Sequence, residues 1–147
     1  MHPNNRFLFV ANELNSTVTV YAHEDGVLAP VETHATLPED FSGEALAAAI
    51  RLTRDGRFLY VSNRIGENSI AAFAVDEGTG ALTPVVIEQS RGRTPRDFIL
   101  DKTDDYLIAA NQDTDTLAVF RVDSITGALT STGDLAAIPS PAGLVLA

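Results

Sequence analysis

The hydrophobic residues of this sequence recur in three short runs that share one pattern. Each run opens on a charged residue, continues through aromatic, aliphatic or small side chains and ends on asparagine: RFLFVAN at residues 6–12, RFLYVSN at 57–63 and DYLIAAN at 105–111. Short apolar runs bounded by turn residues are typical of buried β-strands. The pattern returns about every 50 residues, a period typical of proteins built from stacked repeats.

Each run is followed by further strand patterns. After a short polar turn, a second run rich in β-branched and apolar residues occupies residues 17–21, 69–75 and 116–122. A glycine-containing turn then leads to a third strand at residues 27–28, 82–83 and 129–130. Another strand precedes the second and third runs, at residues 47–53 and 97–101. Residues 44–50 are rich in alanine and suit a helix by propensity, but their place in the repeat favours a strand.

Four short strands per repeat, with no amphipathic helical period, predict an all-β fold, a β-propeller of four-stranded antiparallel blades. We expect an incomplete blade lacking its inner strand at residues 1–41, complete blades at 42–92 and 93–139, and the inner strand of a further blade at 140–147. Closed propellers have about four to eight blades, so about three blades indicate a fragment of a longer parent or a self-associating chain. The missing inner strand and the spare one are complementary, which allows two copies to exchange strands head to tail into a six-bladed ring.

The composition of the chain argues against several classes of function. The chain has 147 residues, of which 45% are hydrophobic and 20% charged, as in ordinary globular domains. A net charge of −10 argues against nucleic-acid binding, which needs clustered Lys and Arg. No apolar stretch is long enough for a bilayer and the first residues lack a signal-peptide pattern, so we expect a cytoplasmic protein with no membrane partner. With no cysteine and three scattered histidines, we expect neither a metal site nor a cofactor.

Comparison of the repeats with one another selects candidate functional residues. Asn12, Asn63 and Asn111 recur unchanged, which favours a structural task such as a side-chain hydrogen bond that closes the strand turn. The next position holds Glu13, Arg64 and Gln112, so its charge differs from blade to blade at a place that can face the central channel. An acid and a base on neighbouring blades are suited to orienting a substrate or transferring a proton. Surface variation or an inter-blade ion pair is the alternative, and it gives these residues no role in catalysis or binding.

Arg96 is the other departure from the repeat. Its equivalents are Ala48 and Ala142, so a guanidinium begins an inner strand where the other copies have a methyl group. Guanidinium groups bind carboxylate or phosphate in a bidentate manner and stabilise oxyanions. A structural pairing with Asp97 or Asp101 is the alternative.

Six ordered motifs carry a resemblance to a known family: HPN at residues 2–4, FLFVANE at 7–13, LPEDFSG at 37–43, DGRFLYVSNR at 55–64, TPRDF at 94–98 and ANQD at 110–113. Together they cover nearly the whole chain and resemble the propeller lactonase family, which includes bacterial 6-phosphogluconolactonases and fungal carboxymuconate cyclases. The resemblance implies a seven-bladed propeller of which this chain is the C-terminal part. Family members carry a further His and Arg on blades upstream of the HPN motif, and this chain has no counterpart of them.

The resemblance also implies roles for the candidate residues. Glu13 and Arg64 match active-site residues of the family, so Glu13, Arg64 and Arg96 are the candidate catalytic residues, and the neighbouring Asn12, Asn63 and Gln112 are candidate substrate-binding residues. The implied activity is the hydrolysis of 6-phosphogluconolactone to 6-phosphogluconate, with a small sugar-phosphate lactone as the partner. A carboxymuconate-type lactonising activity and a non-enzymatic binding scaffold are the alternatives, since fold alone does not dictate function.

Overall fold

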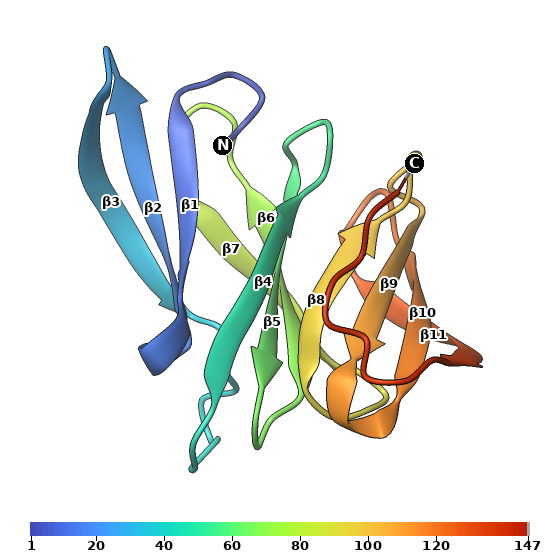
Figure 1. Ribbon diagram of the computed structural model, residues 1–147. Coiled ribbons are helices and arrows are strands. Elements are labelled where there is room, and N and C mark those ends of the chain that lie inside the picture. The colour runs from blue at the N-terminus through green and yellow to red at the C-terminus, as the bar shows by residue number, and fades with distance from the viewer. Residues whose placement is uncertain (147) are drawn as a thin grey trace.

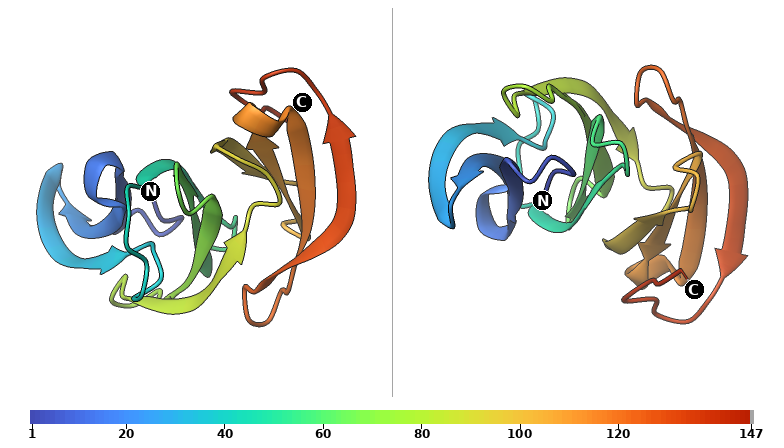
Figure 2. Two further views of the ribbon diagram at one scale, coloured as in Figure 1. Left: turned by 90° about the horizontal axis from the view of Figure 1, so that it is seen from below. Right: turned by 90° about the horizontal axis from the view of Figure 1, so that it is seen from above.

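A computed structural model describes residues 1–146 as three antiparallel sheets that follow one another across the molecule in chain order (Figure 1, Figure 2). The first sheet has three strands, β1 (Phe7–Asn12), β2 (Thr17–Glu24) and β3 (Val27–Ala35). The second has four, β4 (Leu46–Leu52), β5 (Phe58–Arg64), β6 (Ser69–Val75) and β7 (Leu82–Gln89). The third also has four, β8 (Pro95–Leu100), β9 (Tyr106–Asn111), β10 (Thr116–Val122) and β11 (Leu129–Ala137). The predicted all-β architecture of antiparallel blades is confirmed.

Two short 3-10 helices interrupt the strands. Helix η1 (Glu13–Asn15) joins β1 to β2, and η2 (Gln112–Thr114) joins β9 to β10 at the equivalent place in the third sheet. Each is followed by a residue in the left-handed region, Ser16 at φ 49° and Asp115 at φ 56°, which reverses the chain into the next strand. No helix among residues 1–146 has the length and apolar character needed to cross a membrane.

The sheets pack face to face through two apolar clusters that share the second sheet. Leu59 and Val61 of β5 pack with the first sheet, whereas Phe58 and Tyr60 of the same strand pack with the third. All four side chains are buried, because alternate residues of a strand point to opposite faces and both faces of this sheet are covered. A strand covered on both faces has a continuous apolar sequence, which explains why FLYV shows no alternation.

The alanine-rich segment forms a strand, as the repeat predicts, and the helical alternative is wrong. β4 pairs with β5 in antiparallel register, with Leu46 opposite Arg64 and Leu52 opposite Leu59. Ala47 and Ala49 are buried. Their small side chains fit where two sheets approach closely, and this packing outweighs the helical propensity of alanine.

The outer strands are longer than the sequence predicts. β3, β7 and β11 extend for eight or nine residues, where only the first two residues of each were identified. Most side chains of β3 and β11 are exposed, so polar and apolar residues are mixed along them without a clear period.

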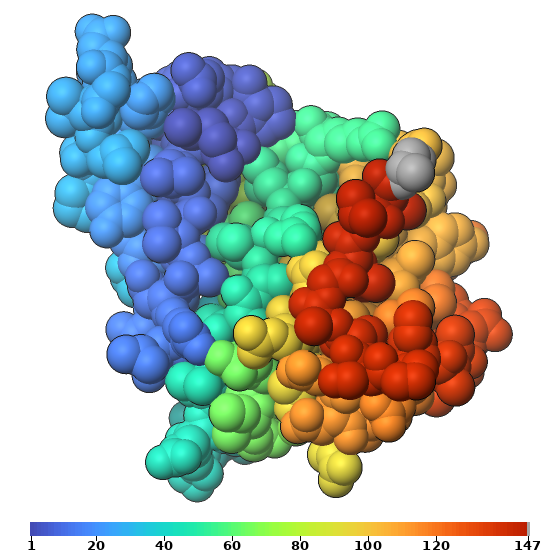
Figure 3. All heavy atoms as spheres, in the orientation of Figure 1, coloured from blue at the N-terminus to red at the C-terminus, as the bar shows by residue number. Residues whose placement is uncertain are grey.

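The C-terminal segment differs from the prediction. Residues 141–146 are not in a strand, although the sequence predicts an inner strand over 140–147; Ala147 lies outside the described residues. Strands need a paired neighbour, and among the described residues this segment has none. Instead it lies over the third sheet (Figure 3, red), where the Leu144 N–H donates a 2.9 Å hydrogen bond to the Asp97 carboxylate.

Candidate active site

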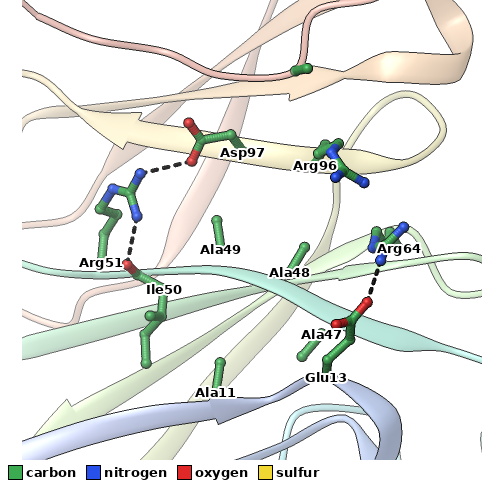
Figure 4. Close-up of a pocket in the computed structure, with 11 residues that line it drawn as sticks. Ala11, Glu13, Ala47, Ala48, Ala49, Ile50, Arg51, Arg64, Arg96 and Asp97 are labelled. Atoms are coloured by element: carbon green, nitrogen blue, oxygen red, sulfur yellow. Dashed lines mark hydrogen bonds and ion pairs between the residues drawn. The ribbon is translucent and has the colours of Figure 1, made fainter.

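A cavity of about 480 Å3 lies where the inner strands of the three sheets approach one another (Figure 4). Its walls come from the end of the first hairpin strand and η1, from β4 and the end of β5, from the start of β8, and from the C-terminal segment. Five of its residues are alanines and five are charged: Ala11, Ala47, Ala48, Ala49 and Ala142, then Glu13, Arg51, Arg64, Arg96 and Asp97. The small side chains leave the space, and the charged side chains line it.

β-bulges shape the two inner strands at the cavity. The register of β4 against β5 shifts between Ala47 and Ile50, and that of β8 against β9 shifts between Pro95 and Asp97. Arg96 is therefore the extra residue of the second bulge. A bulge bends its strand and redirects a side chain, and Arg96 is exposed beside Arg64 at one side of the cavity (Figure 4).

Glu13 and Arg64 form an ion pair across the boundary between the first two sheets. Glu13 is the first residue of η1, and Arg64 is the last residue of β5. The Glu13 side chain is 53% exposed and that of Arg64 is 19% exposed, so the carboxylate is accessible from the cavity while the guanidinium is more enclosed. The ion pair considered in the sequence analysis does form, and both of its residues line the cavity.

A second ion pair lies toward the other side of the cavity. The Arg51 guanidinium donates a 2.8 Å hydrogen bond to Asp97 and another of 2.8 Å to the Ile50 carbonyl. The bond from Arg51 gives the Asp97 carboxylate a partner. Asp101 accepts hydrogen bonds from the Thr103 hydroxyl and the Tyr106 N–H. The alternative that pairs Arg96 with either aspartate is therefore wrong. Within residues 1–146, the Arg96 guanidinium has no hydrogen bond or ion pair.

The structure adds Arg51 and Asp97 to the candidate residues. A signal for both is present in the sequence, because Arg51 is equivalent to Ile99 in the next repeat and Asp97 is equivalent to Ala49. Both are charged residues at inner-strand positions where another repeat has an apolar one, the same signal that identified Arg96.

The recurring asparagines do not line the cavity. Asn63 and Asn111 are fully buried, and their side-chain amides donate to the carbonyls of Thr36 and Ser90, which follow the outer strand of the preceding sheet. Asn12 donates to Thr17 and Thr19 of its own sheet at 2.9 and 2.8 Å. The predicted bond across the strand turn is confirmed for Asn12.

Asn63 also makes a bond across its strand turn, 3.3 Å long, to the Ser69 hydroxyl. Its shorter bond, 2.7 Å to the Thr36 carbonyl, connects two sheets. Gln112 lies at the start of η2, outside the cavity, where its backbone N–H donates to the Thr94 carbonyl. The structure therefore brings Glu13, Arg64 and Arg96 together and leaves Asn12, Asn63 and Gln112 apart from them.

The charges of the cavity favour an anionic ligand. Three arginines and two carboxylates line it, which leaves one net positive charge in a protein whose net charge is −10. The unpaired guanidinium of Arg96 is able to bind a carboxylate, a phosphate or an oxyanion without breaking an existing ion pair. The Glu13 carboxylate, which also lines the cavity, is able to accept a proton from water.

Comparison with known proteins identifies a family with the same fold. The family model described as "Lactonase, 7-bladed beta-propeller" matches residues 1–146. An uncharacterized protein of Lactococcus lactis is 44% identical over 131 residues, which are 88% of this chain and 38% of that protein. The chain thus spans about two fifths of the length of this relative.

Solved structures agree. The periplasmic gluconolactonase of Pseudomonas aeruginosa matches with a TM-score of 0.94 and 35% identity, over 97% of this chain and 40% of that one. A Bacteroides fragilis protein provisionally named a 6-phosphogluconolactonase matches with a TM-score of 0.88 and 32% identity, over 97% of this chain and 39% of that one.

Proposed function

Because this chain belongs to the lactonase family of seven-bladed β-propellers, we propose that the protein of which it forms all or part hydrolyses a sugar lactone. One observation carries the proposal. Glu13 of η1, Arg64 at the end of β5 and Arg96 of β8 come from three different repeats, yet they line one cavity. A carboxylate beside two guanidinium groups supplies both a base for water and a binding site for the negative charge that develops on the carbonyl oxygen.

We propose the following sequence of steps. Arg96 binds the anionic part of the substrate, and Arg64 moves from Glu13 to the lactone carbonyl oxygen. The released Glu13 carboxylate takes a proton from water as the water oxygen attacks the carbonyl carbon. The guanidinium stabilises the resulting oxyanion. The ring C–O bond then breaks, and the ring oxygen takes the proton from Glu13, which gives the open-chain hydroxy acid.

The proposed substrate is 6-phosphogluconolactone. Its phosphate is a dianion near neutral pH, and Arg96 offers a free guanidinium in a cavity with an excess of positive charge. The gluconolactonase from Pseudomonas supports a sugar lactone more generally. A neutral gluconolactone would lack the phosphate contact, so the two lactones should differ in affinity more than in turnover.

A lactone-hydrolysis assay tests the proposal. The opening of 6-phosphogluconolactone and of gluconolactone is followed by acid release and corrected for spontaneous hydrolysis, with the 147-residue chain and with any longer polypeptide that contains it. We expect enzymatic turnover that requires Glu13, with the phosphorylated lactone preferred. No rate above background from either form would rule out a lactonase and leave a binding scaffold.

We also propose a cytoplasmic location, with which the absence of cysteine from these 147 residues is compatible. The Pseudomonas relative is named as periplasmic. Cell fractionation of the producing organism tests this, and recovery in the periplasm would contradict it.

A further inference from the structure

The turn over residues 64–68, which begins at Arg64, differs from the equivalent turns of the other two sheets. It has one residue more than the turns at 13–16 and 112–115, which join the corresponding strands. Three of its residues have φ in the left-handed region, at 61°, 75° and 50°: Ile65, Gly66 and Asn68. A positive φ is unfavourable for a β-branched residue such as Ile65. Backbone strain of this kind persists only where surrounding contacts maintain it, and it clusters at functional sites.

The segment that leads to Arg96 contains a second β-branched residue in the left-handed region. Thr94 has φ 57° and is 8% exposed. Pro95 follows, and its ring fixes its own φ. The direction that the chain takes at Thr94 is therefore carried to Arg96 with little freedom. The contacts of Thr94 thus determine where the Arg96 side chain begins.

All three polar groups of Thr94 are hydrogen bonded. Its backbone N–H donates a 2.7 Å bond to the side-chain oxygen of Asn68, and its carbonyl accepts a 2.9 Å bond from the Gln112 N–H. Its hydroxyl donates to the Asp113 carboxylate. These bonds maintain the unfavourable φ of Thr94. They also connect its segment to two neighbours, the turn that begins at Arg64 and helix η2.

Asn68 joins the two segments that carry Arg64 and Arg96. While its side-chain oxygen accepts the Thr94 N–H, its side-chain NH2 group donates a 3.2 Å bond to the Gly66 carbonyl. One amide group therefore connects the turn that begins at Arg64 to the residue two positions before Arg96. Asn68 is not among the described residues that line the cavity, so it acts on the site through its neighbours.

The guanidinium groups of Arg64 and Arg96 need such a connection. They lie on the same side of the cavity (Figure 4), and like charges repel each other. A substrate that contacts both groups must find them at a fixed separation. A displacement of about 1 Å in an active site is able to lower the rate by about a hundredfold, so a loose segment on either side would weaken the site.

We propose that Asn68 and Asp113 are positioning residues of the active site. Through Thr94 they hold the Arg96 guanidinium in place. Asn68 also fixes the separation of this group from the Arg64 guanidinium, so that one substrate molecule contacts both. The proposal rests on the proposed function, in which Arg96 binds the anionic part of the substrate and Arg64 binds the carbonyl oxygen. It also gives a role to the contact between the TPRDF and ANQD motifs, which Thr94 and Asp113 make.

Binding of 6-phosphogluconate, measured by calorimetry, tests the positioning role. Asn68→Gly removes the amide, and because glycine accepts the positive φ, the backbone is not strained further. The Kd should rise by about tenfold, as expected for coupling within one hydrogen-bond network. Asn68→Asp keeps an oxygen that accepts the Thr94 N–H and tolerates the same φ, so it should bind like the wild type. Asp25→Gly is the matched control with unchanged Kd, because Asp25 has φ 49° and lies exposed between β2 and β3.

The same substitution in the Arg96→Ala protein separates positioning from a general loss of structure. If Asn68 acts through Arg96, Asn68→Gly should weaken binding much less in this background than in the wild type. An equal loss in both backgrounds would overturn the proposal, because the effect would then not depend on Arg96.

A second measurement needs no ligand. NMR relaxation of the free protein reports how ordered the Arg96 backbone N–H is. This order should fall in Asn68→Gly and in Asp113→Ala, but not in Asn68→Asp or Asp25→Gly. Asp113 is exposed, so its truncation leaves the core intact. An Arg96 N–H that is as ordered in Asn68→Gly and Asp113→Ala as in the wild type would overturn the proposal. Loss of order in a protein that neither binds 6-phosphogluconate nor opens lactones would instead reject the proposed function and support the positioning contacts.

Discussion

The Arg51 guanidinium donates a 2.8 Å hydrogen bond to the Asp97 carboxylate across the boundary between the second and third sheets. Arg96, the residue before Asp97 on β8, makes no bond to this carboxylate. Asp97 also accepts the Leu144 N–H, so its two oxygens are both occupied. Arg96 is left as a guanidinium available to a ligand, and its role can be tested separately from the ion pairs.

Arg96→Ala should weaken the binding of 6-phosphogluconate, the proposed product. A hydrogen bond to a charged group contributes about 1.5 to 3 kcal/mol, so we expect the Kd measured by calorimetry to rise by about tenfold or more. Arg91→Ala is the control, because Arg91 pairs with Glu88 and does not line the cavity. Equal Kd values for Arg96→Ala and the wild type would remove Arg96 from the site.

Glu13→Gln should lower kcat far more than it changes KM. Glutamine keeps the size of the side chain and its ability to accept a hydrogen bond from Arg64, but it cannot take a proton from water, and loss of a general base costs roughly 10²- to 10⁴-fold in rate. Steady-state kinetics on the lactone checks this, with Glu24→Gln as the control, since Glu24 lies exposed at the end of β2. Turnover equal to that of the wild type would exclude Glu13 as the base.

The strands can be predicted from the sequence because each core strand is a continuous run of apolar residues. Phe58 to Val61 contact two different sheets, so every residue must be apolar, and the run is visible without a structure. The lengths of β3 and β11 are not visible, because exposed edge strands accept polar and apolar residues alike. Residues 141–146 have a strand-like sequence, but pairing depends on a neighbour that the local sequence does not specify.

The candidate site is predicted where one repeat departs from the others. Glu13, Arg64 and Arg96 were found in this way, and all three line one cavity. Arg51 and Asp97 show the same kind of departure, but their pairing joins β4 to β8, and the two residues are 46 positions apart. The asparagine bonds show a similar limit, since the Asn63 amide reaches Thr36 on a connection whose position depends on the packing of whole sheets.

Asn63→Ala should destabilise the protein by about 2 to 4 kcal/mol, because it leaves buried polar groups without partners. Asn63 donates to the Thr36 carbonyl at 2.7 Å and accepts from the Thr36 hydroxyl at 2.6 Å, and both residues are completely buried. Asn12→Ala, at the equivalent position, should cost only about 1 kcal/mol, because Asn12 is partly buried and its side chain donates to hydroxyl groups of its own sheet.

Urea unfolding of the two asparagine variants measures the difference, and calorimetry with 6-phosphogluconate measures ligand binding. A structural role predicts a large loss of stability for Asn63→Ala with the Kd of the folded protein unchanged. The reverse pattern, with normal stability and lost binding, would support the substrate-binding role that the sequence suggested for Asn63.

The protein should lose stability in acid as Asp55 becomes protonated. Burial alone would raise its pKa, but hydrogen bonds from the Arg57 backbone N–H, the Thr53 hydroxyl and the Arg57 guanidinium outweigh this and lower the pKa to about 2, from an ordinary value of 3.8. The unfolded chain therefore binds a proton more readily than the folded protein between these two values. The stabilisation by Asp55 is fully present above about pH 4 and is lost as the pH falls toward 2. Because the side chain is 48% exposed, solvent screens the interaction and the effect is modest.

Urea unfolding of the wild type and Asp55→Asn should give free energies of unfolding that differ near neutral pH and converge near pH 2. The difference between the two proteins isolates Asp55 from Asp101, whose pKa is also lowered. A difference that stays constant across this range would show that the hydrogen bonds of Asp55 do not favour its ionised form.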